Sequence, residues 1–332
     1  MRLSDEPIIA LDRFAIGYQK ENVLLRNLTL TVNRGEMVAL VGRNGTGKST
    51  LLKSMIGLIK PLDGTCIYED SPFKEYSLPD RARMISFVSS QLTQLPSLTV
   101  SELVGLGRMP YTGWMGRLSA RDETLIQQAL SEVRLAPYAE RRLECLSDGE
   151  RQRAMIARAL VQDTPLMVLD EPTAFLDIPN TYELVRLLSR FRDRGKSIIY
   201  STHDLETAMQ CADKMWVIRE DRVEEGSPED LGLSGLFNEL FSSSGITYDE
   251  QSGRFLFAAL EKGRISLEGT PKEALRWTHK ALDRLGYRVE KDAGMKIEVS
   301  SSTGEVNWIL HRSGSSFRFK KLYSMARFLI QE

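Results

Sequence analysis

Short apolar runs alternate with helical repeats over residues 1–241 of the chain. Residues 37–41, 166–169 and 197–200 are apolar runs too short for helices, and each is followed by glycine or polar residues, which predicts buried strands. The apolar positions after the first run recur at helical spacing: Leu51, Leu52, Met55, Ile56 and Ile59. Strands that alternate with helices in this way favour a mostly parallel sheet with ligands at the carboxyl ends of its strands.

The pattern changes after Ser242-Ser243-Ser244-Gly245, a stretch whose composition is typical of a linker. Beyond it, short runs predict strands at residues 254–258, 265–267, 295–299, 306–310 and 317–319. A helix is predicted to begin at Pro271, and residues 322–330 predict a last helix. The apolar face of the first helix carries Leu275, Trp277, Ala281 and Leu285. We therefore expect an α/β domain of residues 1–241 and a small C-terminal α+β appendage of residues 246–332.

The composition, 42% hydrophobic and 27% charged over 332 residues, is that of an ordinary globular protein. A formal net charge of −1 gives no overall field that would attract nucleic acid or an acidic membrane surface. Residues 1–6 hold acids where a signal peptide would be apolar, and no apolar stretch approaches the ~18 residues of a membrane helix. A membrane process would therefore need another chain. Cys66, Cys145 and Cys211 are far apart in the sequence, which fits a reduced, cytosolic compartment.

A glycine-rich segment follows the first predicted strand: Gly42-Arg43-Asn44-Gly45-Thr46-Gly47-Lys48-Ser49-Thr50. It fits the pattern G-x-x-x-x-G-K-[ST], in which glycines let backbone N–H groups turn toward phosphate oxygens and the next helix adds its positive dipole end. Lys48 can neutralise the β- and γ-phosphates, Ser49 can offer its hydroxyl to Mg2+, and Thr50 can hold the α-phosphate. A plain glycine turn is the alternative, but the strand before and the amphipathic helix after the segment favour a phosphate site.

Two acids, Asp170 and Glu171, end the second predicted strand. Adjacent carboxylates on a buried strand end are costly unless they meet a cation or a reacting group. Asp170 fits a water-mediated Mg2+ ligand, and Glu171 fits the group that orients and polarises the attacking water. His203 follows the next strand, within possible reach of a γ-phosphate. A solvated strand end and a structural histidine are the alternatives, and the phosphate segment favours Lys48, Glu171 and His203 as catalytic residues.

The segment Leu146-Ser147-Asp148-Gly149-Glu150-Arg151-Gln152-Arg153 resembles the signature of the ABC ATPase family, usually written LSGGQ and followed by basic residues. With the phosphate segment and the acid pair, the resemblance covers residues 7–230. It implies a P-loop NTPase core of the ABC ATPase type, with a helical subdomain near residues 95–160. Ser147 and Gly149 at the start of a helix form an anion site, although Ser147 alone would also fit a plain N-cap.

The resemblance also implies a head-to-tail dimer that binds ATP and Mg2+. ATP would lie between the phosphate segment of one copy and the signature of the other, where Ser147, Asp148, Gly149 and Glu150 form the trans site. Phe175-Leu176-Asp177 resembles the D-loop of the family, so that Asp177 would cross the dimer interface. Tyr18 matches the aromatic residue that stacks on adenine, and an ordinary aromatic at a strand edge is the alternative.

The signature departs from the family pattern at two positions. Asp148 stands in place of a glycine and Glu150 in place of a glutamine. Both acids add negative charge near the phosphate, which weakens the binding of ATP between two copies unless Arg151 or Arg153 compensates.

A second departure concerns the loop that carries a glutamine near Mg2+ and the permease contact in the family. Counting back from Leu98-Thr99-Val100 places Ser90 at that position, with Gln91 next to it. A shift of one residue would restore Gln91, and we expect Gln91 to be the metal ligand because it has the reach of an amide.

Residues 99–117 resemble the helical subdomain of ATPases that serve iron-siderophore, haem and cobalamin importers. The alternative is that Leu103, Val104 and Leu106 only pack a helix. The resemblance implies an ATPase whose dimer couples ATP binding and hydrolysis to uptake through a separate integral-membrane permease, and which acts indirectly with a substrate-binding protein. It also implies a peripheral location at the cytoplasmic face of the inner membrane. These residues do not separate the three kinds of cargo.

The appendage carries no motif that we can interpret, and its second half is mildly basic. A solvated face explains the basic residues, and a regulatory or dimer-stabilising domain is the alternative hypothesis. The basic positions are Lys272, Arg276, Lys280, Arg284, Arg288, Arg318, Lys320 and Lys321.

Two other functions remain as alternatives to a transport ATPase. A soluble ABC ATPase that acts on nucleic acid or ribosomes would usually carry two ATP cassettes or a long coiled-coil insertion, and neither is seen in this sequence. The sequence also lacks the basic stripe of a nucleic-acid-binding protein, so no nucleic-acid partner is expected. A nucleotide-binding regulator without turnover would rest on the altered signature.

Overall fold

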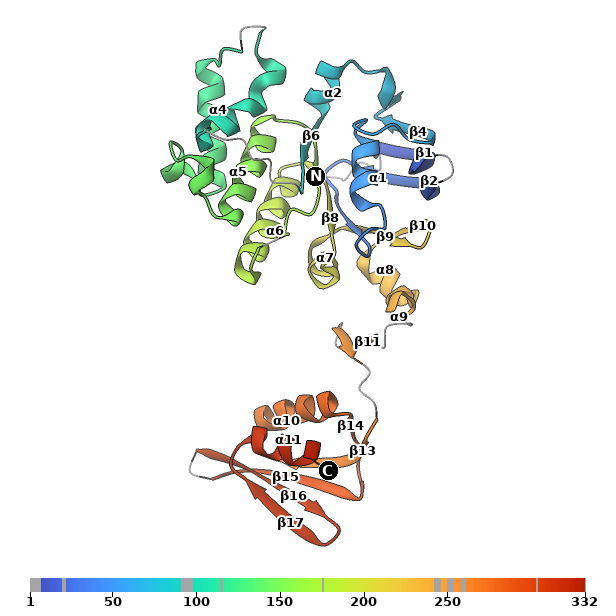
Figure 1. Cartoon of the computed structure of the whole chain (residues 1–332), viewed down its shortest axis with the longest axis vertical. Helices are drawn as coiled ribbons and strands as arrows, with labels where there is room; N and C mark the ends of the chain where they lie inside the picture. Colours follow the sequence, from blue (N-terminus) through green and yellow to red (C-terminus); the bar gives the residue numbers. More distant parts are fainter. Residues whose placement is uncertain are drawn as a thin grey trace. The chain divides into compact units, whose positions relative to one another are not determined.

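The computed structural model describes residues 7–19, 22–90, 98–113, 116–174, 176–241, 246–249, 254–257, 261–302 and 304–331. The chain divides into two compact units, Met1–Ser234 and Gly235–Glu332 (Figure 1). Each unit is described by itself. The predicted linker, residues 242–245, lies outside the described residues.

A six-stranded sheet with the strand order β10-β9-β3-β8-β7-β6 forms the centre of the first unit. Neighbouring strands are parallel except for the antiparallel pair of β9 and β10. Every residue of β3, β7 and β8 is buried, as apolar runs of this kind predict. The predicted, mostly parallel sheet is therefore confirmed. Its strands are β3 (Met37–Val41), β6 (Ile85–Val88), β7 (Leu166–Leu169), β8 (Ser197–Thr202), β9 (Lys214–Arg219) and β10 (Arg222–Gly226).

A second, antiparallel sheet of the first unit was not predicted from the sequence. Its strand order is β2-β1-β4-β5, and its apolar residues join the same core as β3. The pairing of β1 with β2 shifts register repeatedly, and Arg13 and Asn27 adopt φ angles of 47° and 54°. These irregularities interrupt the alternation of apolar and polar residues by which a strand is recognised. The strands are β1 (Pro7–Gln19), β2 (Asn22–Asn33), β4 (Asp63–Tyr68) and β5 (Ser71–Pro72).

Helix α1 (Lys48–Met55) is shorter than its apolar repeat predicts, because Gly57 turns the chain with a φ of 74° and leaves Ile56 and Ile59 after the helix. The other helices of the unit are α2 (Leu78–Met84), α3 (Val100–Gly105), α4 (Ala120–Glu132), α5 (Asp148–Val161), α6 (Ile178–Asp193), α7 (Leu205–Cys211) and α8 (Pro228–Leu233). Short 3-10 helices are η1 (Phe73–Glu75), η2 (Leu106–Tyr111), η3 (Ala136–Tyr138) and η4 (Leu143–Cys145). No helix in the described part of the chain is both long and apolar enough to span a bilayer.

Helices α3, α4 and α5 and the short η2 contact one another and form a helical layer on the side of the unit away from β1 and β2 (Figure 1). At Gly107, in η2, an added Cβ atom would come within 2.2 Å of the carbonyl oxygen of Arg158, in α5. The two backbones therefore touch, and only glycine fits this position.

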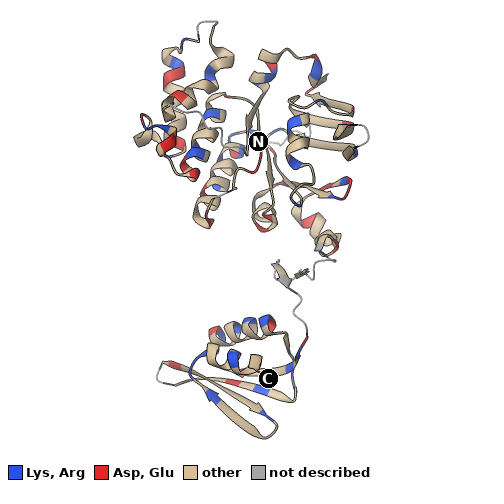
Figure 2. Cartoon of the chain, viewed as in Figure 1, with Lys and Arg blue, Asp and Glu red and all other residues tan. Residues whose placement is uncertain are grey.

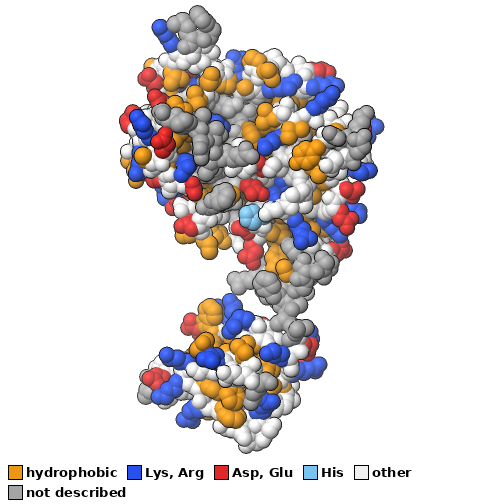
Figure 3. Space-filling model, viewed as in Figure 1, with side chains coloured by type: hydrophobic (Ala, Val, Ile, Leu, Met, Phe, Trp, Pro, Cys, Tyr) orange, Lys and Arg blue, Asp and Glu red, His pale blue; other side chains and the backbone are white. Residues whose placement is uncertain are grey.

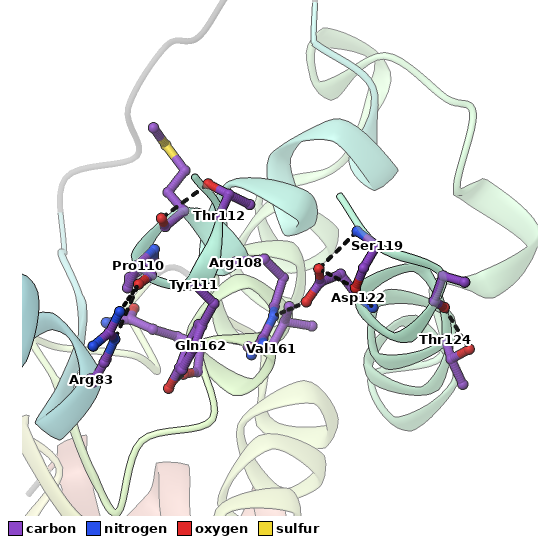
Figure 4. Close-up of polar contacts among 12 residues, drawn as sticks. Arg83, Arg108, Pro110, Tyr111, Thr112, Ser119, Asp122, Thr124, Val161 and Gln162 are labelled. Atoms are coloured by element: carbon purple, nitrogen blue, oxygen red, sulfur yellow. Dashed lines mark hydrogen bonds and ion pairs between the residues drawn. The ribbon is translucent and has the colours of Figure 1, made fainter. Parts of the chain in front are cut away.

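The buried side chain of Arg108 joins three parts of this layer (Figure 4). Its Nε donates to Oδ1 of Asp122, in α4, at 2.7 Å, and its Nη1 donates to the carbonyl oxygen of Val161, at the end of α5, at 2.8 Å. The guanidinium carbon lies 4.0 Å from the ring centroid of Tyr111. Because Asp122 neutralises the buried cation, Arg108 can hold the end of α5 against η2 and α4.

Asp122 also belongs to the cap at the start of α4. Its Oδ2 accepts hydrogen bonds from the backbone N–H of Ser119 at 2.9 Å and from the Ser119 hydroxyl at 2.7 Å. The bonds from the hydroxyl and the backbone of Ser119, together with the bond from Arg108, lower the pKa of Asp122 to about 2. The carboxylate is therefore stabilised in its charged form by the folded structure.

The second unit is built on a five-stranded sheet with the order β14-β13-β15-β16-β17. Strand β13 is parallel to β14 and β15, and β16 is antiparallel to β15 and β17. Figure 1 shows α10 and α11 on the same face of this sheet. The predicted α+β fold of the appendage is confirmed. Its elements are α9 (Leu236–Phe241), β11 (Ile246–Asp249), β12 (Arg254–Phe257), β13 (Gly263–Gly269), α10 (Lys272–Leu285), β14 (Tyr287–Val289), β15 (Met295–Ser302), β16 (Glu305–Arg312), β17 (Ser315–Phe319) and α11 (Leu322–Gln331).

The core of the second unit lies between the five-stranded sheet and its two helices. Ile297 and Leu310 from the sheet pack with Leu282 of α10 and Met325 of α11, and all four are buried. The buried indole N–H of Trp308 donates to the hydroxyl of Thr278 at 2.8 Å, and that hydroxyl donates to the carbonyl oxygen of Ala274 at 2.7 Å. The polar atoms inside this core are thus satisfied by α10 itself.

We predict that Asp122→Asn lowers the free energy of unfolding of the first unit by about 2 kcal/mol at neutral pH. The reason is that the neutral amide of asparagine cannot form the charge-assisted hydrogen bonds of the carboxylate. The folded-state pKa of about 2 lies below the ordinary value of 3.8. The stability that the charged carboxylate contributes is therefore present at pH values above the ordinary pKa. It is lost as the pH falls toward the folded-state pKa. Differential scanning calorimetry of the whole chain at neutral and acidic pH measures it.

The control for this substitution is Glu123→Gln, which changes the exposed neighbour on the same helix. It should leave the unfolding transition and its pH dependence nearly unchanged. If Asp122→Asn were as stable as the unaltered chain at neutral pH, Asp122 would not support the helical layer.

Candidate functional site

Three predicted site segments follow neighbouring strands of the parallel sheet. The phosphate segment follows β3, the acid pair follows β7 and His203 follows β8, and these strands are adjacent in the order β3-β8-β7. Parallel strands bring their carboxyl ends to one edge of the sheet, so segments that are far apart in the sequence meet there.

The phosphate segment has the backbone geometry that its glycines predict. Gly45 and Gly47 adopt φ angles of 82° and 98°, a region that other residues rarely enter. At Gly42, an added Cβ atom would come within 2.8 Å of the Thr46 hydroxyl and 3.0 Å of the Ile218 side chain. The loop is therefore tightly wound directly before the amino terminus of α1, where backbone N–H groups and the helix dipole favour an anion.

Lys48 is buried, and its ammonium group contacts the backbone of this loop. Its Nζ donates to the carbonyl oxygens of Gly42 at 2.9 Å and Arg43 at 3.3 Å. The same Nζ lies 3.4 Å from Oε1 of Glu171. The cation of the phosphate segment and the predicted catalytic carboxylate are therefore in direct contact.

Asp170 is completely buried and accepts hydrogen bonds from three hydroxyl groups. Ser49 donates to Oδ1 at 2.8 Å, Ser201 donates to the same oxygen at 2.8 Å, and Ser90 donates to Oδ2 at 3.0 Å. A carboxylate without water or a counter-ion is stable only when its oxygens are satisfied in this way. The structure thus brings together the two described residues that the sequence assigns to Mg2+, Ser49 and Asp170.

The oxygen atoms of Ser49 and Asp170 suit a magnesium ion. Mg2+ prefers oxygen ligands, keeps several waters, and is usually held by one or two protein groups together with substrate phosphates. The hydroxyl of Ser49 and the carboxylate of Asp170 offer such oxygens directly beside the phosphate segment. Gln91, the third predicted metal ligand, lies outside the described residues. Ser90, the other position considered for that role, is one of the three residues whose hydroxyls donate to Asp170.

Glu171 is held by its backbone as well as by Lys48. Its φ of 46° is unusual for a residue other than glycine, and such conformations cluster at functional sites. Its N–H donates to the hydroxyl of Ser201 at 2.8 Å. Ser201 therefore positions both acids, since the same hydroxyl donates to Asp170. Sequence analysis missed Ser201, although a serine at the polar end of a buried strand beside the catalytic strand was a usable signal.

The signature residues form a capping box at the start of α5. The backbone N–H of Ser147 donates to Oε2 of Glu150 at 2.8 Å, and the Glu150 N–H donates to the Ser147 hydroxyl at 3.3 Å. The Ser147 hydroxyl is also 2.9 Å from Oε2 of Glu150, to which it donates. The backbone bond from Ser147 is the main cause that lowers the pKa of Glu150. The N-cap that was the alternative for Ser147 is therefore present, and the same serine is the one predicted to contact phosphate in trans.

The negative charge of Asp148, the other departure in the signature, is paired with an arginine of the same helix. Nη2 of Arg151 lies 3.1 Å from Oδ1 of Asp148, one turn away on the same helix. The positive charge of Arg153 is among the causes that lower the pKa of Glu150. Both compensating arginines that the sequence suggested are thus placed beside the acidic signature.

Gly149 faces Leu176, whose side chain would lie 3.3 Å from an added Cβ atom.

The remaining predicted residues lie outside the contacts around Asp170 and Lys48. Tyr18 has 71% of its surface exposed, which leaves its ring free for stacking. Asp177 caps α6, where its Oδ1 accepts from the N–H of Asn180 at 3.0 Å. His203 is exposed and lines one hollow with the neighbours of Asp177. The residues around this hollow are Thr173, Leu176, Ile178, Thr181, Tyr182, His203, Asp204, Glu206 and Thr207.

Two family models match the chain, one in each unit. The model described as ABC transporter matches residues 25–174, which include the phosphate segment, the signature and the acid pair. The model described as iron ABC transporter C-terminal domain matches residues 262–330. The second match gives a family to the appendage, in which the sequence showed no interpretable motif.

Curated relatives align over most of their own length. The chain is 36% identical over 259 residues to the petrobactin import ATP-binding protein FpuC of Bacillus anthracis, which covers 76% of this chain and 92% of that protein. It is 32% identical over 241 residues to the ferric enterobactin transport ATP-binding protein FepC of Escherichia coli (strain K12), with coverages of 72% and 89%.

A solved structure supports the same assignment. The dimeric ATP-binding cassette MJ0796, in a post-hydrolysis state with ADP and Pi, superposes with a TM-score of 0.60 at 27% identity and covers 66% of this chain and 98% of that one. The predicted P-loop NTPase fold is thus confirmed. The chain therefore belongs to the ABC transporter family, as an ATP-hydrolysing subunit of the importer type.

Proposed function

We propose that two copies of this chain bind ATP and Mg2+ head to tail and use hydrolysis to drive an importer. The observation that carries the proposal is the contact network at the sheet edge, where Lys48, Ser49, Asp170 and Glu171 are joined by direct contacts. In each site, one copy provides the loop from Gly42 to Thr50 and the other provides the signature from Ser147 to Glu150. Tyr18 stacks on the adenine.

Each residue has a role that follows from its chemistry. Lys48 leaves the carbonyl oxygens of its loop and pairs with the β- and γ-phosphates, which frees Glu171 to accept a hydrogen bond from the attacking water. Mg2+, when held by Ser49 and Asp170, supplies positive charge to the phosphate oxygens. His203 donates to the γ-phosphate, and Asp177 contacts the second copy. Ser90 or Gln91 completes the magnesium site from the loop after β6.

The cargo that we propose is an iron-siderophore, haem or cobalamin. The chain resembles proteins named for petrobactin and ferric enterobactin transport, and a cobalamin import ATP-binding protein of Halobacterium salinarum is 35% identical over 212 residues. The match of residues 262–330 to a domain named for iron transporters favours an iron chelate. A separate integral-membrane permease carries the cargo, and a substrate-binding protein delivers it.

The proposed location follows from these partners. The chain is held at the cytoplasmic face of the inner membrane by its permease. Residues 1–241 form the nucleotide-binding domain, with the permease-facing helical subdomain near residues 95–160, and residues 246–332 form an accessory domain. Co-purification of a permease with the tagged chain, and ATPase stimulation by that permease in lipid, test this assembly. Stimulation by nucleic acid alone would contradict it.

We predict that Glu171→Gln binds ATP but hydrolyses it at least a hundredfold more slowly, a loss of about the size that removal of a catalytic base causes. The amide keeps the shape of the side chain but cannot polarise the attacking water. Light scattering with ATP and Mg2+ should show a trapped dimer, and an ATPase assay gives the rate. Hydrolysis at the normal rate would exclude Glu171 from the role of the polarising group.

We predict that Ser90→Ala raises the Mg2+ concentration for half-maximal ATPase activity about tenfold, because groups that orient a metal ligand contribute effects of this size. The substitution removes one of the three hydroxyl bonds to Asp170. A titration with Mg2+ at saturating ATP measures the shift. Ser90→Thr keeps a hydroxyl at this position and should leave the titration nearly unaltered. An equal effect of both substitutions would mean that the loop conformation, not the contact with Asp170, is responsible.

We predict that Glu150→Gln lowers the KM for ATP about threefold to tenfold with little change in kcat, because the loss of one charge-assisted bond is of this size. The carboxylate holds the Ser147 hydroxyl and repels phosphate, whereas an amide oxygen can still accept the Ser147 N–H and keep the cap. Asp148→Asn is the control, since that acid pairs with Arg151 instead. An unchanged KM in Glu150→Gln would show that Glu150 does not compete with ATP for Ser147.

A further inference from the structure

The C-terminal domain is basic although the chain as a whole is not. Residues 246–332 contain 15 lysines and arginines and 11 aspartates and glutamates, a formal charge of +4. The whole chain contains 44 basic and 45 acidic residues, a formal charge of −1. The overall balance therefore hides a basic domain joined to an acidic one, and a charge asymmetry of this kind indicates an anionic partner.

The excess of positive charge lies on the helices of this domain, as the blue positions on α10 and α11 in Figure 2 show. Lys272, Arg276, Lys280 and Arg284 follow one another at four-residue spacing along α10, and all four are exposed. Residues four apart lie on one side of a helix, so they form a single stripe. Three further exposed basic residues lie at the start of α11 and along it: Lys320, Lys321 and Arg327.

The same helices expose large apolar side chains among these cations. Trp277, Tyr323 and Ile330 have 51%, 70% and 51% of their surfaces exposed, so the assignment of Trp277 to the buried apolar face of its helix was wrong. The Nζ of Lys280 lies 4.9 Å from the ring centroid of Trp277. Figure 3 shows hydrophobic and basic side chains side by side over the second unit. We call the exposed side of α10 and α11, with residues 320 and 321, the helical face.

Acids on the helical face are few. Glu273 and Asp283 are the exposed acids of α10, and Oδ2 of Asp283 lies 2.9 Å from Nδ1 of His279. Among the described residues of α11 there is no aspartate or glutamate. The seven lysines and arginines of the helical face therefore exceed its two acids.

The opposite face of the sheet is different, because several of its charges are paired with one another. Nζ of Lys296 lies 2.5 Å from Oε1 of Glu268 and 2.7 Å from Oε1 of Glu298. Nη1 of Arg264 lies 2.9 Å from Oε2 of Glu290 on the neighbouring strand. Ion pairs of this kind leave little net field, so the larger excess of unpaired positive charge lies on the helical face.

We propose that the helical face binds the surface of an anionic phospholipid bilayer. Lysines and arginines attract the lipid phosphates, while tryptophan and tyrosine are side chains that settle at the level of the headgroups with one end apolar and the other wet. Ile330 enters the apolar boundary, and the long stems of Lys280 and Arg276 let their charges reach the phosphates. A nucleic acid would use the same cations but gains nothing from an exposed isoleucine.

This inference rests on the proposed location at a membrane, but it does not depend on ATP hydrolysis. The domain would hold its chain close to the bilayer in addition to the permease. Since the helical face is exposed in the second unit by itself, binding needs neither nucleotide nor a second copy. Failure of lipid binding and failure of the ATPase mechanism are therefore separate outcomes.

The experiment measures sedimentation of the whole purified chain with vesicles, without nucleotide. Vesicles of phosphatidylglycerol mixed with phosphatidylcholine should bind the chain, whereas vesicles of phosphatidylcholine alone should not, and added salt should weaken binding. The triple substitution Arg276→Gln, Lys280→Gln and Arg284→Gln should weaken binding about a hundredfold, because each basic side chain near an anionic surface contributes about fivefold. Trp277→Ala should weaken it about tenfold.

The matched control removes three charges from the rest of the same domain: Arg264→Gln, Arg288→Gln and Arg318→Gln. It should bind vesicles nearly as well as the unaltered chain, and so should Glu171→Gln. Equal losses in both triple variants would overturn the assignment to the helical face. No binding to the anionic vesicles, or tighter binding to a DNA or RNA duplex at the same salt concentration, would overturn the proposal of a lipid surface.

Discussion

The site depends on one buried carboxylate whose hydrogen bonds come from three separate parts of the chain. Asp170 is fully removed from solvent, and Ser49, Ser90 and Ser201 donate to it from the start of α1 and from the ends of β6 and β8. A charge in this position is tolerable only while all three segments stay in register, because each lost donor leaves a desolvated oxygen. The same bonds bring the phosphate segment and the ends of β6, β7 and β8 together at one edge of the sheet. Folding and the placement of the site are therefore the same physical requirement.

The two ends of the signature helix are held by different kinds of contact. At the carboxyl end of α5, Arg108 holds the carbonyl of Val161, and the amide of Gln162 donates to the carbonyl oxygens of Ala82 and Ile85 at 2.6 Å and 3.1 Å. At the amino end, Ser147 is occupied by a carboxylate of its own helix. If ATP binds between two copies as proposed, its phosphate has to replace an existing bond of Ser147 instead of filling an empty site. Differential binding of this kind is what lets nucleotide shift an equilibrium between open and closed dimers.

Sequence patterns predicted the central fold well where one local rule decides the structure. Buried parallel strands are continuous apolar runs, and the glycines at positions 45 and 47 are required by left-handed backbone, so both were readable from short windows. The antiparallel sheet was missed because its bulges interrupt the alternation on which recognition depends. Ser201 was missed for another reason. Its importance comes from a contact with residues 30 and 31 positions earlier, which only the pairing of β7 with β8 creates.

The C-terminal domain shows how structure can locate a function that sequence patterns leave open. Inside the domain, the polar atoms of Trp308 and Thr278 satisfy each other, so the core has no chemistry left to offer. On the open side of the sheet, Lys296 is shared between two glutamates, so those charges are already neutralised. The helical face is the part of the described domain where the excess of cations over acids is greatest and where Trp277, Tyr323 and Ile330 are exposed. An exposed tryptophan beside lysine and arginine costs solvation free energy unless a partner covers the ring and meets the charges together. A surface that is apolar below and anionic above satisfies both demands at once, which is why a bilayer fits this face better than a purely polar polyanion.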